Sequence, residues 1–314
     1  MTAVPSRAGL IDGGLIDAVI VNWNSGGDLA NCLASLDRHG GGLLADVIVV
    51  DNGSVDGSAA VPPPAGLRLT LDPAARNLGF AAACNRGARQ GRAPYLLILN
   101  PDTVLHAGAL EAMLDGFGPS VGLVGPRQLD GAGRTRRSCS RFPTPLAFWL
   151  RALGLDRLTR FARFAPFMTD WPHEESGAVD QLMGACLLIR RELFDRLEGF
   201  DEEFFLYYED VDLALRARRL GALSWFAASG TITHFGGGSS RRIPARRLGL
   251  SLASRLRYAR KHFGALGFAS TALCTCLVEP WCRLVFAALR QGPRAARDVA
   301  SGYALLFRRG LTRP

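Results

Sequence analysis

The chain contains only one lysine, Lys261, so arginine supplies nearly all of the positive charge behind its formal net charge of +9. Compositional bias in the coding DNA would produce this imbalance without any function, so we do not interpret the charge as a nucleic-acid-binding surface. The charge still needs a partner, and phosphate-rich substrates and an anionic membrane surface both fit it.

The seven cysteines form no C-x-x-C pair and no cluster with histidine at zinc-binding spacing. Their number is odd, and most lie in apolar stretches, where a free cysteine behaves as a small hydrophobe. This usage predicts a reduced, cytosolic compartment. We also expect no signal peptide, because Asp12 and Asp17 break the apolar segment around Leu15-Ile16.

Both common phosphate-binding loops are absent. A dinucleotide-binding fold needs G-x-G-x-x-G after its first strand, and residues 22–27 (NWNSGG) do not match it. A Walker A loop is excluded because Lys261 is not preceded by glycine. Any nucleotide must therefore be bound without either loop.

Apolar runs alternate with helical patterns over the first half of the chain. A hydrophobic content of 48% and a charged content of 21% are those of a globular protein. The alternation predicts βαβ units and a mostly parallel sheet flanked by helices, an α/β fold. We expect strands at 18–21, 47–50, 67–71, 95–99 and 121–124, and helices at 29–36, 79–90 and 107–117.

Polar residues stand at the ends of three of these strands, at Asn24, Asp51 and Asp102. In such sheets ligands bind beyond the carboxyl ends of the strands, which makes these positions the first functional candidates. Asp51 opens Asp-Asn-Gly-Ser, which is good turn chemistry. A carboxylate there could equally bind a ribose hydroxyl or a base N–H group, so both interpretations stay open.

Asn100-Pro101-Asp102-Thr103 is a candidate metal site. A hard divalent cation prefers oxygen ligands and keeps positions open for substrate phosphates, so one carboxylate at a strand end can hold it. The alternative is a helix cap, with Asp102 or Thr103 starting the helix that follows. His234 ends an apparent strand before three glycines and could complete the metal site with Asp102.

Glu209 and Asp210 follow an aromatic run and precede arginines, which would complement the dipole of a helix. Dipole matching explains one or two acids but not the further acids Asp201, Glu202 and Glu203. Apolar surroundings would raise the pKa of a carboxylate toward the range of a general base. We therefore favour a functional role for this cluster.

The second half of the chain is less regular. It comprises a basic loop at 134–141, a helical stretch from Pro145 to about Phe164, and a strand or buried segment at 179–190. A basic helical region from about residue 243 leads to apolar runs at 263–278 and 281–289, which Glu279-Pro280 interrupts. The interrupted run falls short of a membrane span. We expect a helix on an anionic membrane surface, the alternative being a packed cap with a solvated basic face.

Taken together, these residues resemble family-2 glycosyltransferases of the GT-A fold, especially rhamnosyltransferase-like enzymes that build bacterial surface polysaccharides. Any one matching stretch is weak, but they follow the family order over about residues 17 to 240. The stretches are VIVNWN (19–24), DNGSVDG (51–57), NLGFAAACN (77–85), LNPDT (99–103), GACLLIR (184–190), GFDEEFFLYYEDVDLALR (199–216) and HFGGGS (234–239).

The resemblance implies an inverting transfer from a dTDP- or UDP-sugar with Mg²⁺ or Mn²⁺. Asp51 would contact the nucleoside, and Asp102 is the surviving acid of a D-x-D motif in which Asn100 replaces the first. Asp210, paired with Glu209, matches the catalytic base, and His234 matches a position that can join the metal. The implied nucleotide-sugar-binding residues are Asn22, Asn24, Asp51, Asn77, Gly79, Asn85, Asn100 and Asp102.

The resemblance further implies a saccharide or polyprenyl-diphosphate-linked acceptor and a place in the cytoplasm at the inner face of the membrane. We expect a flexible start at 1–16, a GT-A domain at 17–240 and a helical C-terminal region at 241–314, a candidate for membrane association. A nucleotidyltransferase acting on sugar phosphates, or a non-catalytic sugar-binding protein, would share the scaffold. The nucleotidyltransferase would need a basic loop after the first strand, and residues 22–27 contain no arginine or lysine.

Overall fold

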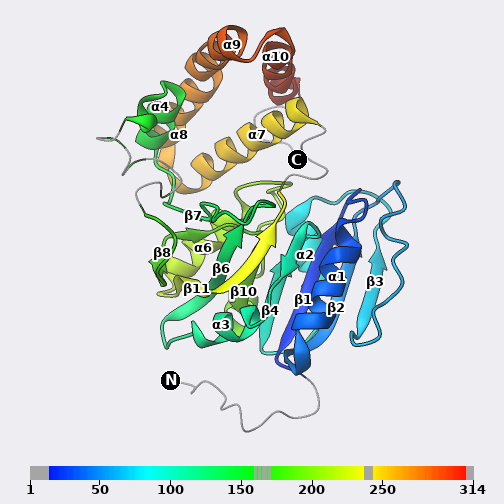
Figure 1. Ribbon diagram of the computed structural model, residues 1–314. Helices are drawn as coiled ribbons and strands as arrows, with labels where there is room; N and C mark the ends of the chain where they lie inside the picture. The colour runs from blue at the N-terminus through cyan, green and yellow to red at the C-terminus, as the bar shows by residue number, and fades with distance from the viewer. Residues whose placement is uncertain are drawn as a thin grey trace. The chain divides into compact units, whose positions relative to one another are not determined.

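The computed structural model describes residues 14–158, 161, 164, 168, 171–236 and 243–308 (Figure 1). These residues form a sheet unit (14–140, 172–202 and 210–236) and a helical unit (141–171, 203–209 and 243–308). The helical unit thus takes in more of the chain than a single boundary at residue 240 predicts. Residues 1–13 of the expected flexible start at 1–16, and residues 237–242, lie outside the described residues, whereas Ile16 is buried and already belongs to the first strand.

Strands in the sheet unit form one large sheet and a small separate pair. The large sheet contains β1 (Ile16–Asn22), β2 (Leu44–Asp51), β3 (Leu69–Pro73), β4 (Tyr95–Leu99), β5 (Thr103–Leu105), β6 (Val121–Leu129), β8 (Gly177–Val179), β10 (Cys186–Arg190) and β11 (Leu223–His234). The pair is β7 (Cys139–Ser140) with β9 (Gln181–Leu182). The large sheet runs in the order β3-β2-β1-β4-β10-β6-β11-β5, and β8 also pairs with β11.

The expected α/β sheet is confirmed, but it is mixed rather than mostly parallel. The neighbours β3-β2-β1-β4 are parallel, and so are β6 and β11. In contrast, β10 runs antiparallel to both β4 and β6, and β5 and β8 run antiparallel to β11. The segment expected at 179–190 contributes β9 and β10 separately, and β10 is reached by a long excursion rather than a helical crossover that would fix its direction.

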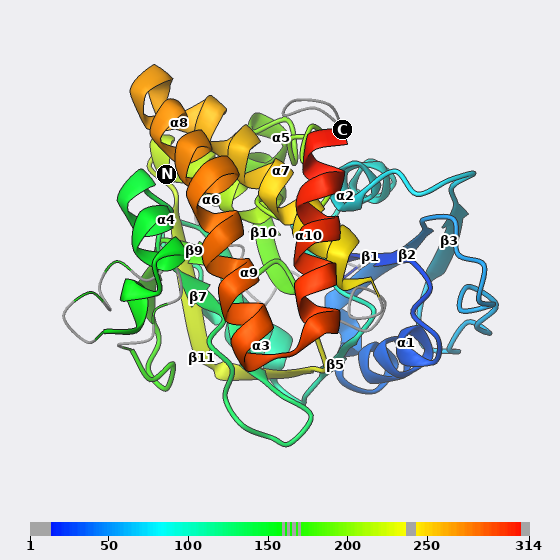
Figure 2. The same ribbon diagram turned by 90° about the horizontal axis from the view of Figure 1, so that it is seen from above.

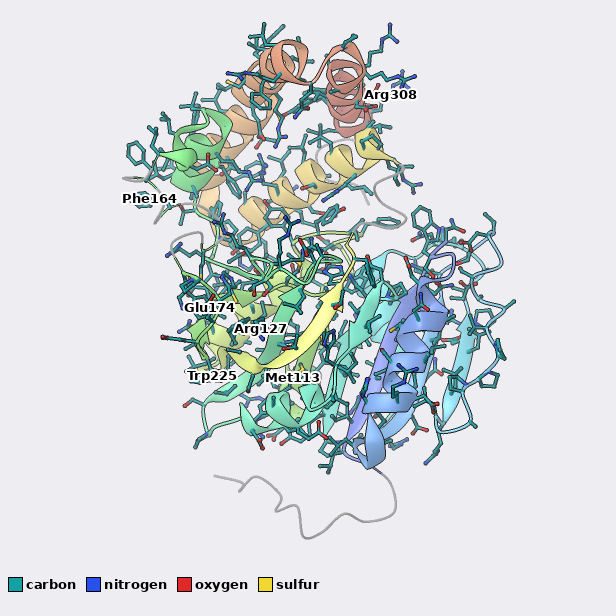
Figure 3. The ribbon with its side chains drawn as sticks, viewed as in Figure 1. Met113, Arg127, Phe164, Glu174, Trp225 and Arg308 are labelled. Carbon is teal, nitrogen blue, oxygen red and sulfur yellow. The ribbon has the colours of Figure 1, made fainter. Side chains whose placement is uncertain are left out.

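Helices cover both faces of the sheet. Ile16, Ala18 and Ile20 of β1 share one buried cluster with the apolar sides of α1 and α3, and Figure 3 labels Met113 and Trp225, where α3 packs on β11. On the other face, Gly87 of α2 lies against Val19, because a Cβ there would come within 2.5 Å of that side chain. The helices are α1 (Asp28–His39), α2 (Phe80–Ala88), α3 (Ala109–Asp115), α5 (Arg191–Arg196) and α6 (Glu209–Arg219), with a 3₁₀ turn at Gly41–Leu43.

Asp17 is a fully buried carboxylate within β1. Its Oδ2 atom accepts hydrogen bonds from Arg191 Nη2 at 2.8 Å and from the main-chain N–H group of Ala93 at 2.7 Å. We expect Arg191→Met to lower the free energy of unfolding by about 3 kcal/mol, because it leaves a buried charge uncompensated. Denaturant titration would measure this, with Arg92→Met at an exposed neighbouring position as the control. Equal stability of the two variants would contradict the assignment.

The helical unit is built from α4 (Pro145–Ala152), α7 (Pro244–His262), α8 (Gly264–Leu273), α9 (Glu279–Arg290) and α10 (Pro293–Arg308), with a 3₁₀ turn at Leu155–Arg157. The helix expected from Pro145 to about Phe164 ends earlier, at Ala152, and Gly154 then takes a left-handed conformation with φ of +71°. Figure 2 shows α9 and α10 side by side, and both contact the rest of this unit.

Glu279-Pro280, which interrupts the apolar run in the sequence, does not interrupt the helix. A π-helical turn, Cys274–Val278, joins α8 to α9, and Pro280 lies just after it, where the locally altered hydrogen-bond pattern accommodates its missing N–H group. Within the described part of the chain, Gly264–Arg290 is the one helix long and apolar enough to cross a membrane by length and composition. The core helix of a soluble protein can be as long and as apolar, but such a helix is mostly buried. In Gly264–Arg290 only 22% of the most apolar 18-residue stretch is buried.

Candidate active site

The ends of β1 and β2 carry the first pair of predicted site residues. Asn22 and Asp51 are neighbours in the parallel register, and Asn22 Nδ2 donates to Asp51 Oδ1 at 3.0 Å. The same amide reaches Ser54 Oγ at 3.2 Å and Ser58 Oγ at 3.0 Å. Asn22 therefore fixes the orientation of the Asp51 carboxylate, which is 8% exposed.

The turn interpretation of Asp51 is also correct in part. Gly53 has a φ of +75°, and a Cβ there would come within 3.0 Å of the main chain of Arg76, so the reversal of the chain depends on this glycine. Asn24, with a φ of +50°, accepts from the N–H group of Val55 at 2.8 Å and thereby ties the loop after β1 to this turn. Gly53 and Asn24 therefore shape the turn, and Asp51 contributes the carboxylate at its start.

Asn52 organises the next loop. Its Oδ1 atom accepts from the N–H group of Leu78 at 2.7 Å, and its Nδ2 atom donates to Gly79 O at 3.1 Å and to Asn77 Oδ1 at 3.2 Å. Asn77 Oδ1 in turn accepts from the N–H group of Gly79 at 2.9 Å. Gly79, with a φ of +91°, precedes the first residue of α2, so these residues fix how that helix begins next to the β2 turn.

Asn85 lies in α2 and is bonded to a different segment. Its amide donates to Phe200 O at 2.8 Å and to Glu202 Oε1 at 3.0 Å, and its Oδ1 atom accepts from the N–H group of Phe200 at 2.9 Å. Gly199 passes so close that a Cβ would come within 2.4 Å of Asn85 Oδ1. Both donors of the amide are thus committed to the protein, so Asn85 positions the 199–202 loop.

Asp102 and His234 are brought together by sheet pairing. His234 ends β11 opposite Thr103 of β5, and the N–H group of Phe235 donates to Asp102 O at 3.0 Å. The Asp102 and His234 side chains are both largely buried, and His234 Nε2 lies 3.4 Å from Asp102 Oδ1. The proximity that the order of the motifs suggested is therefore present in the fold.

The helix-cap alternative for Asp102 does not fit the structure. The helix that follows begins at Ala109 with Gly108 as its cap residue, and Thr103–Leu105 form a strand. Thr103 Oγ1 donates to Asn100 O at 2.6 Å, which closes a tight turn between β4 and β5. Asp102 therefore lies in a loop at the carboxyl end of β4, as a ligand-binding residue of such a sheet would.

The chemistry and spacing of Asp102 and His234 fit a divalent cation. Two ligand atoms about 2.1 Å from one ion, at an angle of 90–110°, lie about 3.0–3.5 Å apart. The 3.4 Å separation falls in this range. Within the described residues no group of three or more His, Cys, Asp or Glu side chains could hold a metal, so a cation here would keep positions for substrate phosphates and water.

Gln128 and Arg136 hold His234 from two sides. Gln128 Oε1 lies 3.1 Å from His234 Nδ1, and Gln128 is 1% exposed. A Gln128 Oε1 atom that accepts from Nδ1–H would hold the proton on that nitrogen, which is the tautomer in which Nε2 can bind a metal. Arg136, from the predicted basic loop, donates from Nη1 to His234 O at 2.7 Å, which places a cation beside this pair.

Asp210 is held by two segments. Its Oδ1 atom accepts from the N–H group of Val211 at 2.8 Å, in the first turn of α6. Its Oδ2 atom accepts from the N–H group of Gly184 at 3.0 Å and from Gln181 Nε2 at 2.9 Å. Burial raises the pKa of the Asp210 carboxyl above its ordinary value, although these hydrogen bonds oppose the rise.

The neighbouring acids differ from Asp210. Asp212 is fully buried and bonded to Arg216 at 2.6 Å, and Arg216 also donates to Leu197 O and Gly199 O, so this pair fastens α6 to the preceding loop. Glu209 is buried at the first position of α6 and belongs to the helical unit. The three acids thus separate into a structural one, Asp212, and the two predicted candidates.

Strand direction places the candidate residues of the sheet unit at one edge. The carboxyl ends of β1, β2 and β4 meet there, and β10, being antiparallel, begins there with Cys186 opposite Leu99. Asn100 donates its N–H group to Ala185 O at 2.9 Å, next to the Gly184 N–H group that binds Asp210. The candidate residues for nucleoside binding, for metal binding and for the catalytic base therefore lie at the same edge of the sheet.

Comparison with known proteins identifies the family. The sequence model described as "Glycosyl transferase family 2" matches residues 17–197. The chain belongs to glycosyl transferase family 2. It is therefore a glycosyltransferase, and the family assigned from its motifs is confirmed.

One relative and two solved structures illustrate the membership. N-acetylglucosaminyl-diphospho-decaprenol L-rhamnosyltransferase of Mycobacterium tuberculosis is 32% identical over 253 residues, which cover 74% of this chain and 80% of that protein. The mannosyltransferase PcManGT of Pyrobaculum calidifontis, solved with GDP-Man and Mn²⁺, has a TM-score of 0.55 at 20% identity. The match covers 94% of this chain and 81% of that one. GalNAc-T7, solved with UDP, GalNAc and Mn²⁺, has a TM-score of 0.54 at 14% identity, and the match covers 94% of this chain and 59% of that one. The two structures show the fold, which is the GT-A fold expected.

Several residues of this family-2 site were not singled out from the sequence. Each acts through contacts distant along the chain, which leave no periodic or spacing signal. The available clues were the Asn-Gly step after a buried strand, for Asn52, and the basic loop at 134–141, for Arg136. The residues are Asn52, Ser54, Ser58, Gln128, Arg136 and Gln181.

Proposed function

We propose that this family-2 enzyme transfers a sugar with inversion from a dTDP- or UDP-sugar to a saccharide or polyprenyl-diphosphate-linked acceptor, in the synthesis of cell-surface polysaccharide. The observation that carries the proposal is the Asp102–His234 pair, at the same sheet edge as Asp51 and the Gly184 contact of Asp210. A donor lying along this edge has its nucleoside toward Asp51 and its diphosphate toward Asp102.

In this mechanism Asp210 removes the proton of an acceptor hydroxyl while that oxygen attacks the anomeric carbon. Attack from the face opposite the diphosphate, in one displacement, inverts the configuration. Asp102 and His234 would hold Mg²⁺ or Mn²⁺, which when bound supplies neutralisation of the departing phosphate charge. Arg136, beside His234, is positioned to add to this stabilisation.

The relative from Mycobacterium tuberculosis supports the finer assignments. Its name gives L-rhamnose as the transferred sugar and a decaprenyl-diphosphate-linked N-acetylglucosamine as the acceptor. We propose rhamnose as the sugar and a lipid-linked saccharide as the acceptor for this chain, at the cytoplasmic face of the membrane. Family membership favours this over nucleotidyl transfer and over a non-catalytic sugar-binding role.

A panel of nucleotide sugars tests the donor and the metal together. We expect dTDP-rhamnose with Mg²⁺ or Mn²⁺ to raise the melting temperature more than GDP- or CMP-sugars do, because the bound donor stabilises the folded state by mass action. The same panel in transfer assays with a short polyprenyl-diphosphate saccharide tests the reaction. Equal stabilisation by every donor, with or without metal, would argue against the proposal.

Gln128→Leu tests how His234 is positioned for the metal. The substitution removes the acceptor of the Nδ1–H bond and frees the ring to turn, so we expect Mn²⁺ affinity to fall by about 10–100-fold. Electron paramagnetic resonance of Mn²⁺ binding gives the affinity without any turnover. Gln90→Leu, at an exposed position in the same unit, is the matched control and should bind as the wild type does. Unchanged affinity in Gln128→Leu would remove Gln128 from this role.

A further inference from the structure

The helix from Gly264 to Arg290 carries an exposed apolar face. Its side chains follow one another at intervals of four residues from Leu273 onward, which keeps them on one side of the helix. They include Leu266 at 88%, Trp281 at 70% and Leu289 at 78% exposure. The face, called the apolar stripe here, comprises Leu266, Leu273, Leu277, Trp281, Val285 and Leu289.

A buried ion pair fixes the opposite face of this helix within the helical unit. Glu279 is 1% exposed and forms an ion pair with Arg255 of α7, and its other oxygen accepts from Arg283 Nε at 2.7 Å. The Arg255 guanidinium also stacks 4.8 Å from the ring centre of Phe148. Separating the helix from α7 would remove the Arg255 charge that compensates the Glu279 carboxylate.

The charge of the protein is concentrated around the same helix. Residues 243–308 contain eleven arginine and lysine residues against two acids, Glu279 and Asp298, a surplus of nine. The net charge of the whole chain is also +9, so the remainder is neutral by formal count. Exposed arginines follow the apolar stripe directly, at Arg290, Arg294 and Arg297.

We propose that the helical unit binds an anionic bilayer surface, with the Gly264–Arg290 helix lying in the membrane plane and the apolar stripe inserted among the acyl chains. An anionic surface matches the charge surplus, and an exposed tryptophan between Leu277 and Val285 on the stripe suits the interface between headgroups and hydrocarbon. The occupant is therefore lipid rather than a second protein.

The same contacts argue against a membrane crossing. Glu279 lies near the middle of the helix and is joined to α7, which itself carries arginines along its length. A crossing would either break the Arg255–Glu279 pair or draw α7 into the hydrocarbon, and both are costly. The in-plane arrangement keeps the pair intact and exposes only the apolar stripe to lipid.

Vesicle flotation with the full chain tests the proposal. We expect co-flotation with vesicles of phosphatidylcholine containing about 30 mol% phosphatidylglycerol, and at least about tenfold weaker binding to pure phosphatidylcholine. Leu277→Glu/Trp281→Glu should lower partitioning to the anionic vesicles by about a hundredfold, since two anchors are lost. The control is Leu71→Glu/Leu220→Glu, which places the same charges at positions of 48% exposure in the sheet unit.

Fluorescence of the wild type and of a conservative variant gives a second readout, which does not require the Leu277→Glu/Trp281→Glu variant to fold. Bromine-labelled lipids should quench part of the wild-type tryptophan emission, and Trp281→Leu should still bind vesicles but lose that quenching. Equal flotation of the two double variants, no binding of the wild type, or resistance of the bound protein to alkaline carbonate would each overturn the in-plane proposal. Donor binding in the thermal-shift assay, which needs no vesicles, separates this outcome from failure of the proposed function.

Discussion

Asp210→Asn is expected to reduce sugar transfer by about a thousandfold while donor binding persists. A positioned general base contributes about 10²–10⁴ in rate, and an amide cannot accept the proton of the acceptor hydroxyl. The substitution keeps the shape of the side chain beside Gly184, and it leaves Asp51, Asp102 and His234 unchanged. The loss should therefore fall on kcat, with the Kd of the donor close to that of the wild type.

The pH dependence gives this prediction a second readout. The base is active as the carboxylate, so the wild-type rate falls as the pH falls through the pKa of Asp210. Because burial raises that pKa, the acid limb should lie above the ordinary aspartate range of about 4. Single-turnover rates against pH measure the limb, and Asp115→Asn, at an exposed position, should retain it. Full activity in Asp210→Asn would transfer the role to another group.

Asp102→Asn is expected to weaken Mn²⁺ binding by about a hundredfold and transfer by a similar factor or more. The variant loses the negative charge that a hard cation requires, and it keeps the main-chain oxygen of Asp102 that accepts from the N–H group of Phe235. Calorimetry of donor binding with and without metal shows the difference: wild type should depend on metal strongly, and the variant weakly.

Asn100→Asp provides the opposite change at the same site. It restores the first acid of the D-x-D motif, so we expect Mn²⁺ to bind more tightly than in the wild type. Chelation should abolish wild-type transfer, and added Mn²⁺ should restore it. Transfer that survives both chelation and Asp102→Asn would show that the diphosphate leaves without a metal.

The early strands and their polar ends could be predicted because both signals are local. Val19–Val21 and Val47–Val50 are continuous apolar runs, and each is stopped by a polar residue that the structure places at the sheet edge. The family pattern, which fixes the order of distant motifs, also anticipated that Asp102 and His234 would lie together. These parts of the site depend on chain direction more than on detailed packing.

Other parts could not be predicted because they depend on contacts between distant residues. Gln128 has no feature of its own in the sequence, and its role arises only when β6 and β11 become neighbours. The antiparallel direction of β10 follows from how the chain returns to the sheet, which periodicity does not reveal. Glu279-Pro280 divides the apolar run, but the π-helical turn before Pro280 leaves the helix continuous, which the sequence does not reveal.

The direction of β10 gives the fold a place where it can change in evolution. Leu129 ends β6 at the same sheet edge where Cys186 begins β10, so residues 130–185 leave and return at that edge. Such a segment can lengthen or shorten without shifting the register of the strands outside it. Of the strands in the large sheet, β8 lies within the segment. The stretch between Arg136 and Gln181 can thus change with the acceptor, while Arg136 and Gln181 themselves and the loops after β1 and β2 keep their places in the site.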